Sequence, residues 1–409
     1  MYDLLRSRAA ALTDPAVEFT QELIRIPSVS LNELQVAGAV ERIMRTYGFD
    51  RVFRDDYGNV VGVLFGMENG PTVLAVSHMD TVTADAPELW AHAPHSGRVE
   101  NGRIFGVGAA DCKGGLAAQI FAAVALKRSL LPLRGNLVVA ATVAEENGAS
   151  VGVRALLEET LPELGLHAEW AILGEPTNLG LYYGHEGWAT LSIYLQGKDP
   201  FQVMDASRLV YQDFGQRGAA GRANNGKENF CVAEPHSSAN GGESLAEIRL
   251  TRRLLYGESL SDVVSMTRYC AGESAGAAGL VGVDVELTQE RQHLATGKIR
   301  TVPRVSHPWM TDPFSPIVER ATHALSAAGS RARPGQFILD RLGMGTAGGT
   351  LVTELGVPTI GYGPGDEQAA HARDEYVETR NLAEAIYGNA AIAHSLVGVP
   401  VYGWSSDEI

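Results

Sequence analysis

The feature that most constrains the fold is a set of short apolar runs separated by a helical segment without breakers. Thr72–Val76, Asn136–Val143 and Trp170–Leu173 are almost continuously apolar, as strands buried on both faces are. Gly115–Lys127, between the first two runs, is rich in Ala and Leu and predicts a helix. Buried strands that alternate with helices predict an α/β fold with a doubly wound, mixed sheet. In such a sheet, the loops at the strand ends carry the functional site.

The sequence pattern changes from about Leu181. Pro15–Arg25 and Asn32–Tyr47, before that point, have the helical spacing of surface helices. After it, Ala189–Leu195 alternates as a half-exposed strand does, and Ala206–Phe214 has helical spacing. The second set of elements predicts a small α+β unit.

Two segments of the second half lack these patterns. Gln216–Asn229 is rich in Gly and Asn and predicts a mobile loop, and Gln292–Pro308 predicts a linker. The α/β pattern resumes with a helix at Pro313–Ala328 and the end of a buried strand at Pro358–Gly361.

The length of 409 residues is more than one core needs, which favours two domains. The pattern predicts an α/β domain formed by residues 1–180 and 293–409. An inserted α+β domain of residues 181–292 interrupts it.

Charge and composition exclude several classes of partner. Lys and Arg number 33 against 48 Asp and Glu, a net charge of −15 without a long basic block, so nucleic acid is not expected. No apolar run reaches the ~20 residues of a membrane-spanning helix, and the start of the chain is polar and acidic rather than signal-like. The three cysteines form no Cys-x-x-Cys pair. We therefore expect a soluble, cytoplasmic protein without a membrane partner.

Titratable side chains follow the predicted strands. His78 and Asp80 come directly after the first buried run and point to the same face of an extended chain. This spacing is typical of a histidine ligand and the carboxylate that orients it. A buried structural histidine is the alternative for this pair alone.

A glycine-dense turn, Gly106–Gly115, leads into the predicted helix and has Asp111 at its centre. It lacks the spacing of a phosphate-binding loop, and the carboxylate does not suit a phosphate. Asp111 is therefore either part of a structural turn or a carboxylate that bridges metal ions.

Acidic residues follow two further buried runs. Glu145 and Glu146 come after one, and Glu175 comes after the next. Adjacent buried carboxylates repel each other, and a bound dication or a raised pKa would resolve the conflict. The alternative is that these side chains are solvated in loops. His371 follows a fourth strand end.

Two histidines and three carboxylates after separate strands suit one or two divalent ions such as Zn²⁺, Co²⁺ or Mn²⁺. A further carboxylate beside them is what metal-assisted hydrolysis needs as a base.

At these positions the chain resembles the co-catalytic metallohydrolases that include aminoacylases, acetylornithine deacetylases, succinyl-diaminopimelate desuccinylases and glutamate carboxypeptidases. Four ordered motifs carry the resemblance, and no single one would be specific. They are His78-x-Asp80-x-Val82, Gly106-x-Gly108-x-x-Asp111-x-Lys113-Gly114, Glu145-Glu146 with Glu175-Pro176, and Gly361-x-Gly363-Pro364-Gly365 with Ala370-His371 and Glu375.

The resemblance implies a catalytic α/β domain with an inserted ferredoxin-like lid, through which such proteins often form homodimers or higher homo-oligomers. It implies two metal ions that share Asp111, with His78 and Glu175 on one and Glu146 and His371 on the other. Glu145 would take a proton from the metal-bound water and pass it to the leaving nitrogen. Asp80 would orient His78.

The lid departs from the family pattern. The stretch that carries a histidine for the oxyanion reads Gly197–Val203 here and has none. Such a donor is worth ~3 kcal/mol, so its loss affects the chemistry. His185 is a candidate replacement, although an isolated histidine is more often structural. Arg253 is a candidate ligand for a substrate carboxylate, and Glu186 stands where a basic residue is usual.

Three functions fit these residues. The first is hydrolysis of a C–N bond in a small substrate with a carboxylate, an N-acyl amino acid or a dipeptide. The second is hydrolytic deamination of an activated aromatic amine such as an aminobenzoate, which needs less help from an oxyanion donor. The third is an inactive metal-containing binding protein, against which the retention of Glu145 argues.

Overall fold

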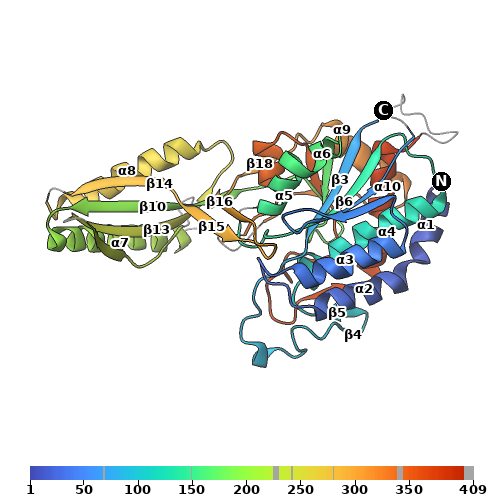
Figure 1. Ribbon diagram of the computed structural model, residues 1–409, viewed down its shortest axis with the longest axis horizontal. Coiled ribbons are helices and arrows are strands. Elements are labelled where there is room, and N and C mark those ends of the chain that lie inside the picture. Colours follow the sequence, from blue (N-terminus) through green and yellow to red (C-terminus); the bar gives the residue numbers. More distant parts are fainter. Residues whose placement is uncertain are drawn as a thin grey trace.

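The computed structural model has two lobes joined by a narrow waist (Figure 1). It describes residues 1–67, 70–148, 150–223, 230–240, 243–279, 281–338 and 344–399. The large lobe contains both ends of the described chain, and the small lobe is formed by its middle.

An eight-stranded mixed sheet forms the centre of the large lobe in the described part of the chain. In spatial order its strands are β1 (Arg51–Arg54), β2 (Val60–Leu64), β6 (Asn136–Thr142), β3 (Thr72–His78), β7 (Ala168–Leu173), β20 (Thr359–Gly361), β8 (Leu181–Tyr182) and β19 (Pro334–Gly335). The central strands are parallel: β3 pairs with β6 and β7, and β7 pairs with β20.

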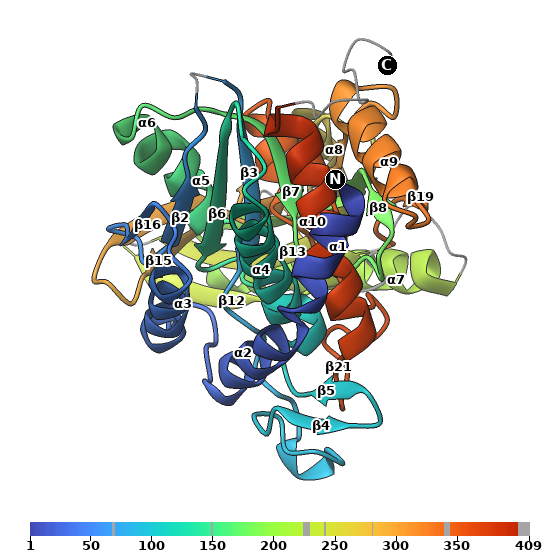
Figure 2. The same ribbon diagram turned by 90° about the vertical axis from the view of Figure 1, so that its right-hand side faces the viewer.

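Helices cover both faces of this sheet. Val73 and Ala75 of β3 belong to the core on one face, while Leu74 and Val76 belong to the core on the other. Figure 2 shows α1, α4 and α10 side by side over the first face. The helices of the large lobe are α1 (Tyr2–Ala10), α2 (Thr13–Arg25), α3 (Leu34–Thr46), α4 (Gly114–Ser129), α5 (Val151–Ala155), α6 (Leu161–Glu163), α9 (Pro316–Ala327) and α10 (Thr379–Val397).

The helical segment Ala109–Ser129 is long and apolar enough to cross a membrane, but its apolar window is completely buried in the protein. It contains α4, which lies in the core between α1, α2 and α10 and therefore has no polar face.

The small lobe is a six-stranded antiparallel sheet with two helices on one face. Its elements are β10 (Gly187–Gly197), α7 (Pro200–Ala223), β11 (Phe230–Val232), β12 (His236–Asn240), β13 (Glu243–Leu254), α8 (Leu260–Gly276), β14 (Gly282–Leu287) and β17 (Val305–Ser306). The predicted α/β class, with a doubly wound mixed sheet and an inserted α+β unit, is confirmed.

Three small sheets complete the fold. They are the hairpin β15 (Gln289–His293) with β16 (Ile299–Pro303), the pair β9 (Gly184–His185) with β18 (Trp309–Met310), and the sheet of β4 (Arg98–Glu100), β5 (Arg103–Phe105) and β21 (Tyr376–Glu378). The pair β9 and β18 lies where the chain passes between the two lobes.

Two segments differ from the prediction. The loop predicted over Gln216–Asn229 is wrong up to Ala223, because α7 continues that far, and residues 224–229 lie outside the described part. Arg217 pairs with Asp213 one turn earlier at 3.1 Å, which adds a small local stabilisation to this part of the helix.

The linker predicted over Gln292–Pro308 is also wrong, because β15 and β16 form a hairpin there. Leu294 and Val302 of this hairpin are buried in the core of the large lobe, which holds it in place. The domain boundaries at residues 181 and 292 stay a prediction. The described elements place β8 in the large sheet and begin the small sheet at Gly187.

Candidate metal centre

The predicted ligands gather at one edge of the large sheet. His78 ends β3, Glu145 and Glu146 follow β6, and Glu175 follows β7. Since β3 is parallel to both β6 and β7, the carboxyl ends of these strands lie together. Asp111 reaches the same place from the turn before α4.

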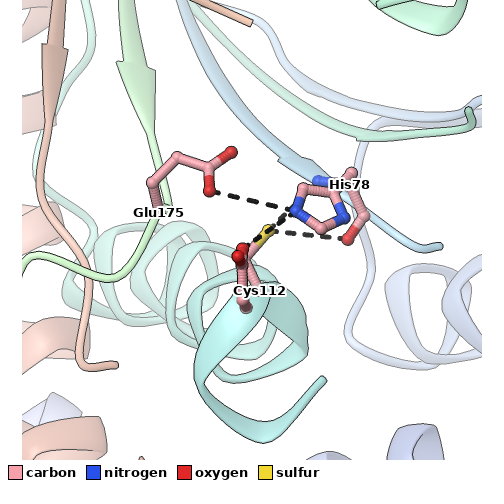
Figure 3. Close-up of side chains that lie close together, drawn as sticks. His78, Cys112 and Glu175 are labelled. Carbon is pink, nitrogen blue, oxygen red and sulfur yellow. Dashed lines mark hydrogen bonds and ion pairs between the residues drawn. The ribbon is translucent and has the colours of Figure 1, made fainter. Parts of the chain in front are cut away.

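His78, Asp111 and Glu175 form the first group of ligand atoms, with Cys112 beside them. The Nε2 atom of His78 lies 3.1 Å from Asp111 Oδ1 and 3.9 Å from Glu175 Oε2. Figure 3 shows Glu175 and Cys112 on the same side of the His78 ring.

Asp111, Glu146 and His371 form the second group. The Nε2 atom of His371 lies 3.0 Å from Glu146 Oε1 and 3.3 Å from Asp111 Oδ2. Asp111 thus offers one carboxylate oxygen to each group. Within each group the candidate ligand atoms lie within 4.8 Å of one another. Imidazole nitrogens and carboxylate oxygens at this spacing fit divalent transition-metal ions.

The electrostatics of the site also favour a cation. Burial raises the pKa of Glu175, and the carboxylates of Asp111 and Glu145 raise it further. Burial lowers the pKa of His371, but its hydrogen bonds to Asp111 and Glu146 raise this pKa to about 11. A positive charge is therefore strongly favoured between these carboxylates. A divalent ion bound there would supply this charge and leave the imidazoles neutral.

The second ring nitrogen of His78, Nδ1, donates a hydrogen bond to a backbone carbonyl. Nδ1 lies 2.8 Å from the carbonyl oxygen of Asp80, and the nearer carboxylate oxygen of Asp80 is 3.7 Å away. This differs from the expected contact, in which the Asp80 carboxylate orients the ring. The carbonyl fixes the tautomer with the proton on Nδ1, which leaves the Nε2 lone pair for a metal.

The carboxylate of Asp80 holds the next loop instead. It accepts hydrogen bonds from the backbone N–H groups of Glu145 at 3.1 Å and Glu146 at 3.0 Å, and from the Ser30 hydroxyl at 2.7 Å. Asp80 is fully buried. It therefore fixes both the candidate base and a candidate ligand through their backbone.

Glu145 itself has a carboxylate with no hydrogen bond or ion pair in the described part of the chain. Burial raises its pKa to about 8; Glu146, Asp80 and Asp111 act in the same direction and His78 opposes them. The side chain lines a small cavity with Asp111, Glu146 and His371. An unengaged carboxylate at this place is suited to proton transfer.

Sequence reasoning did not assign the supports of this loop and turn, although Glu375 stands in the fourth motif. Glu375 is buried and accepts the backbone N–H groups of Ala110 at 2.8 Å and Asp111 at 3.0 Å. Glu33 accepts the N–H groups of Leu31 at 2.8 Å and Ala144 at 3.0 Å. Only the spacing Ser30-x-x-Glu33 before a helix signals such a role, since it resembles a capping box.

Cys112 was not predicted as part of the site. Its sulfur accepts the His78 N–H at 3.2 Å, and burial raises the pKa of the thiol. The thiol form is therefore favoured, which suits packing behind His78 rather than metal binding.

His185 lies away from the ligand groups. It is fully buried, its Nδ1 donates to the Glu186 carbonyl at 2.6 Å, and its Nε2 accepts the Thr346 N–H at 3.0 Å. Burial lowers the pKa of His185 to about 4. These contacts use both ring nitrogens and do not support the predicted substrate-binding role, which stays untested.

Arg253, the other predicted substrate ligand, lies on β13 opposite Trp188 of β10. Its Nη1 is 3.6 Å from Glu186 Oε2, and 16 % of its side chain is exposed. Glu186, which replaces the usual basic residue, thus neutralises part of the charge of Arg253.

Two cavities meet at His371. The small one, of about 20 Å³, contains Glu145, and the larger one, of about 450 Å³, is lined by Val82, Trp90 and Arg373 among others. Arg373 has no ion pair with any described residue. A substrate with its reacting bond near Glu145 has room for a substituent beside Arg373.

Comparison with known proteins shows the family to which the chain belongs. A family model described as peptidase family M20/M25/M40 matches residues 74–395. A putative succinyl-diaminopimelate desuccinylase DapE of Mycobacterium tuberculosis is 29% identical over 390 residues, 91% of this chain and 96% of that protein.

Two solved structures share the fold. The di-peptidase Dug1p from Saccharomyces cerevisiae has a TM-score of 0.69 at 14% identity and covers 97% of this chain and 98% of its own. The dinuclear metal-binding M20 peptidase YXEP of Bacillus subtilis has a TM-score of 0.64 at 16% identity and covers 94% of this chain and 98% of its own. The resemblance seen in the four motifs is therefore confirmed: this chain belongs to peptidase family M20/M25/M40 and is a metal-dependent hydrolase that acts on C–N bonds.

Proposed function

We propose that this enzyme hydrolyses an amide bond in a small substrate that bears a carboxylate, an N-acyl amino acid or a dipeptide. The observation that carries the proposal is the position of Glu145. Its unengaged carboxylate lines one cavity with Asp111, Glu146 and His371.

His78, Asp111 and Glu175 would hold one divalent ion, and Asp111, Glu146 and His371 a second. When bound, Zn²⁺, Co²⁺ or Mn²⁺ supplies Lewis-acid chemistry, which polarises the carbonyl group and activates water at neutral pH. The sharing of Asp111 between the two groups supports a site for one or two ions.

Glu145 acts as the general base and then as the general acid. It takes a proton from the attacking water and delivers it to the leaving nitrogen, so the amine departs neutral. Asp80 positions Glu145 through the backbone hydrogen bond at 3.1 Å and does not contact the reacting atoms.

Recognition of a substrate carboxylate requires a cation near the site. Arg253 and Arg373 are the two candidates. Arg253 is engaged by Glu186, whereas Arg373 lines the cavity that begins at His371. The desuccinylase and dipeptidase activities in the names of the relatives support a small substrate of this class.

Deamination of an activated aromatic amine such as an aminobenzoate is the second candidate, and the connection between β10 and α7 favours it. That connection consists only of Lys198 and Asp199, so it supplies no histidine for an oxyanion. An aromatic substrate disperses the developing charge itself and needs that donor less.

We also propose that the protein is cytoplasmic and forms a homodimer or a higher homo-oligomer through the small lobe. The large acidic excess and the scarcity of cysteine support the first statement. Equilibrium sedimentation of the whole protein tests the second.

The deciding experiment couples metal analysis of the purified protein to a product assay. Acylamino acids, dipeptides and aminobenzoates are offered, and released amino acid is scored against released ammonia. We expect amino acid release that stops after chelation and returns with Zn²⁺, Co²⁺ or Mn²⁺. Ammonia from an aminobenzoate would instead establish the deaminase, and turnover that survives complete chelation would remove the mechanism.

A further inference from the structure

We propose that Ser306, with Trp188 beside it, donates hydrogen bonds to the carbonyl oxygen of the substrate and so replaces the missing lid histidine. Ser306 lies on β17 and pairs with Trp188 of β10, where the small lobe joins the large one. This inference rests on the proposed amide hydrolysis.

Ser306 and Trp188 carry buried donors without a partner. Neither the Ser306 hydroxyl nor the Trp188 Nε1–H has a hydrogen-bond partner among the described residues, and the two side chains are buried, with 8 % and 2 % exposure. A buried donor without a partner destabilises the folded protein, because it has lost its hydrogen bonds to water. A ligand oxygen that accepts from these groups regains that free energy, so they are poised to bind one.

The two donors converge on Gly345. A Cβ atom on this glycine would lie 3.4 Å from Trp188 Nε1 and too close to the Ser306 hydroxyl to be accommodated. Any side chain at position 345 would therefore displace the Ser306 hydroxyl, and glycine leaves it in place beside the cavity wall.

Ser306 and Gly345 line the same cavity as Glu145, Glu146 and His371. Its volume of about 20 Å³ suits a single oxygen atom with its bonded partner. A serine hydroxyl changes direction by rotation about one bond, so Ser306 serves this cavity without movement of its backbone.

His185, the replacement that the sequence suggests, is already engaged. Both ring nitrogens of His185 are hydrogen-bonded, and the short connection between β10 and α7 contains no histidine. Ser306 therefore has the position and the free hydrogen that the reaction needs.

The proposed step forms one C–O bond and breaks one C–N bond. Water forms a C–O bond to the carbonyl carbon, and its proton passes to Glu145. The carbonyl oxygen gains negative charge, which strengthens its hydrogen bonds from Ser306 and Trp188. When the C=O bond re-forms, the C–N bond breaks, and the proton on Glu145 goes to the nitrogen.

The test compares Ser306→Ala with the wild-type holoenzyme on an amide substrate found in the product assay and on its thioamide analogue. We expect kcat for the amide to fall about 10²-fold to 10³-fold, with KM changed less than threefold. Because sulfur is a weak acceptor, the substitution should change thioamide hydrolysis only a few-fold. A purely structural role would lower both rates equally.

Ser330→Ala is the matched control, since Ser330 also has a buried hydroxyl without a partner among the described residues but does not line the cavity. It should leave kcat unchanged. Trp188→Phe removes the N–H donor together with part of the buried ring, and it should lower kcat less than Ser306→Ala. Ser306→Cys nearly keeps the size of the side chain but replaces the hydroxyl by a weak hydrogen-bond donor. It therefore tests the inference if Ser306→Ala does not fold.

An amide kcat for Ser306→Ala within twofold of wild type overturns the inference and leaves the proposed function intact. If wild type hydrolyses no amide while it deaminates an aminobenzoate, the proposed function has failed and this inference fails with it. The two failures are therefore distinguishable by the wild-type product alone.

Discussion

The Nε2 atom of His185 accepts a hydrogen bond from the backbone N–H of Thr346 at 3.0 Å, and so ties the β9 strand to the wall of the site cavity. The Thr346 hydroxyl lies 2.9 Å from the same nitrogen. Nε2 can accept these bonds only while the ring is neutral. A residue that sequence alone offers as a substrate ligand is thus placed to support the loop that begins at Gly345.

His185 should make stability depend on pH. Its pKa is lowered from 6.5 to about 4 by burial, so below pH 6.5 the unfolded chain binds a proton that the folded chain does not. Stability due to this residue is complete above pH 6.5 and is lost as pH falls toward 4. Between pH 7.5 and 5 this loss is about 2 kcal/mol.

Urea unfolding of metal-free wild type and His185→Gln at both pH values measures the difference. The variant should show a smaller decrease in the free energy of unfolding, and its kcat at pH 7.5 should fall less than tenfold. Equal pH dependence in the two proteins would disprove the neutral, buried state of His185.

Glu145→Gln should lower kcat by about 10²-fold to 10⁴-fold, because glutamine cannot accept the proton of water. The metal content should equal that of wild type, since Glu145 belongs to neither ligand group. Metal analysis and kinetics on the same preparation check both statements. Glu146→Gln is the contrasting variant and should lose metal; full activity of Glu145→Gln would exclude it as the base.

Arg373→Met should raise KM about five-fold to tenfold for a substrate with a free carboxylate, with kcat changed less than threefold. The reason is that Arg373 lines the larger cavity and has no ion pair with a described residue. A carboxamide analogue of the substrate should show no such effect. Arg253→Met is the comparison and should raise KM less, because Glu186 already engages that guanidinium. The reverse order would assign the substrate carboxylate to Arg253.

Gly115→Ala should destabilise the protein by about 2 kcal/mol and weaken metal binding. The added Cβ would collide with the backbone carbonyl of Gly174, directly before the ligand Glu175. Gly38→Ala in α3 is the control, because its Cβ would meet only Arg54, at 3.7 Å. We expect the control to be as stable as wild type or up to about 1 kcal/mol more stable. Thermal unfolding and metal titration measure both variants, and equal behaviour would exclude the tight contact.

Three of the candidate ligands, His78, Glu146 and Glu175, could be predicted because each lies at or shortly after the end of a buried apolar run. His78 and Glu175 are local signals of this kind, since strand direction alone brings their positions to one edge. The tertiary partners could not be predicted. The Asp80 carboxylate binds backbone groups 65 and 66 positions away, and no local pattern encodes such a pair.

The same limit applies to the small lobe. Register places Arg253 opposite Trp188, near Glu186, and strand register is not readable from one alternating segment. Gly and Asn content suggested a loop over Gln216–Asn229, but α7 continues to Ala223. In this part of α7, contacts made in the folded chain override the loop propensity of the residues.

The candidate ligands come from segments that lie far apart in the sequence, and this separation affects when the site forms during folding. In the sequence, His78 comes before the small lobe and His371 comes after it, and each belongs to a different ligand group. A chain still on the ribosome holds the first group long before it holds the last histidine. Because contacts between distant segments form slowly, the centre is completed late in folding. The small lobe is built mainly from one uninterrupted stretch, so it has everything needed to fold earlier, and hydrolytic competence waits until the segment that carries His371 has been made.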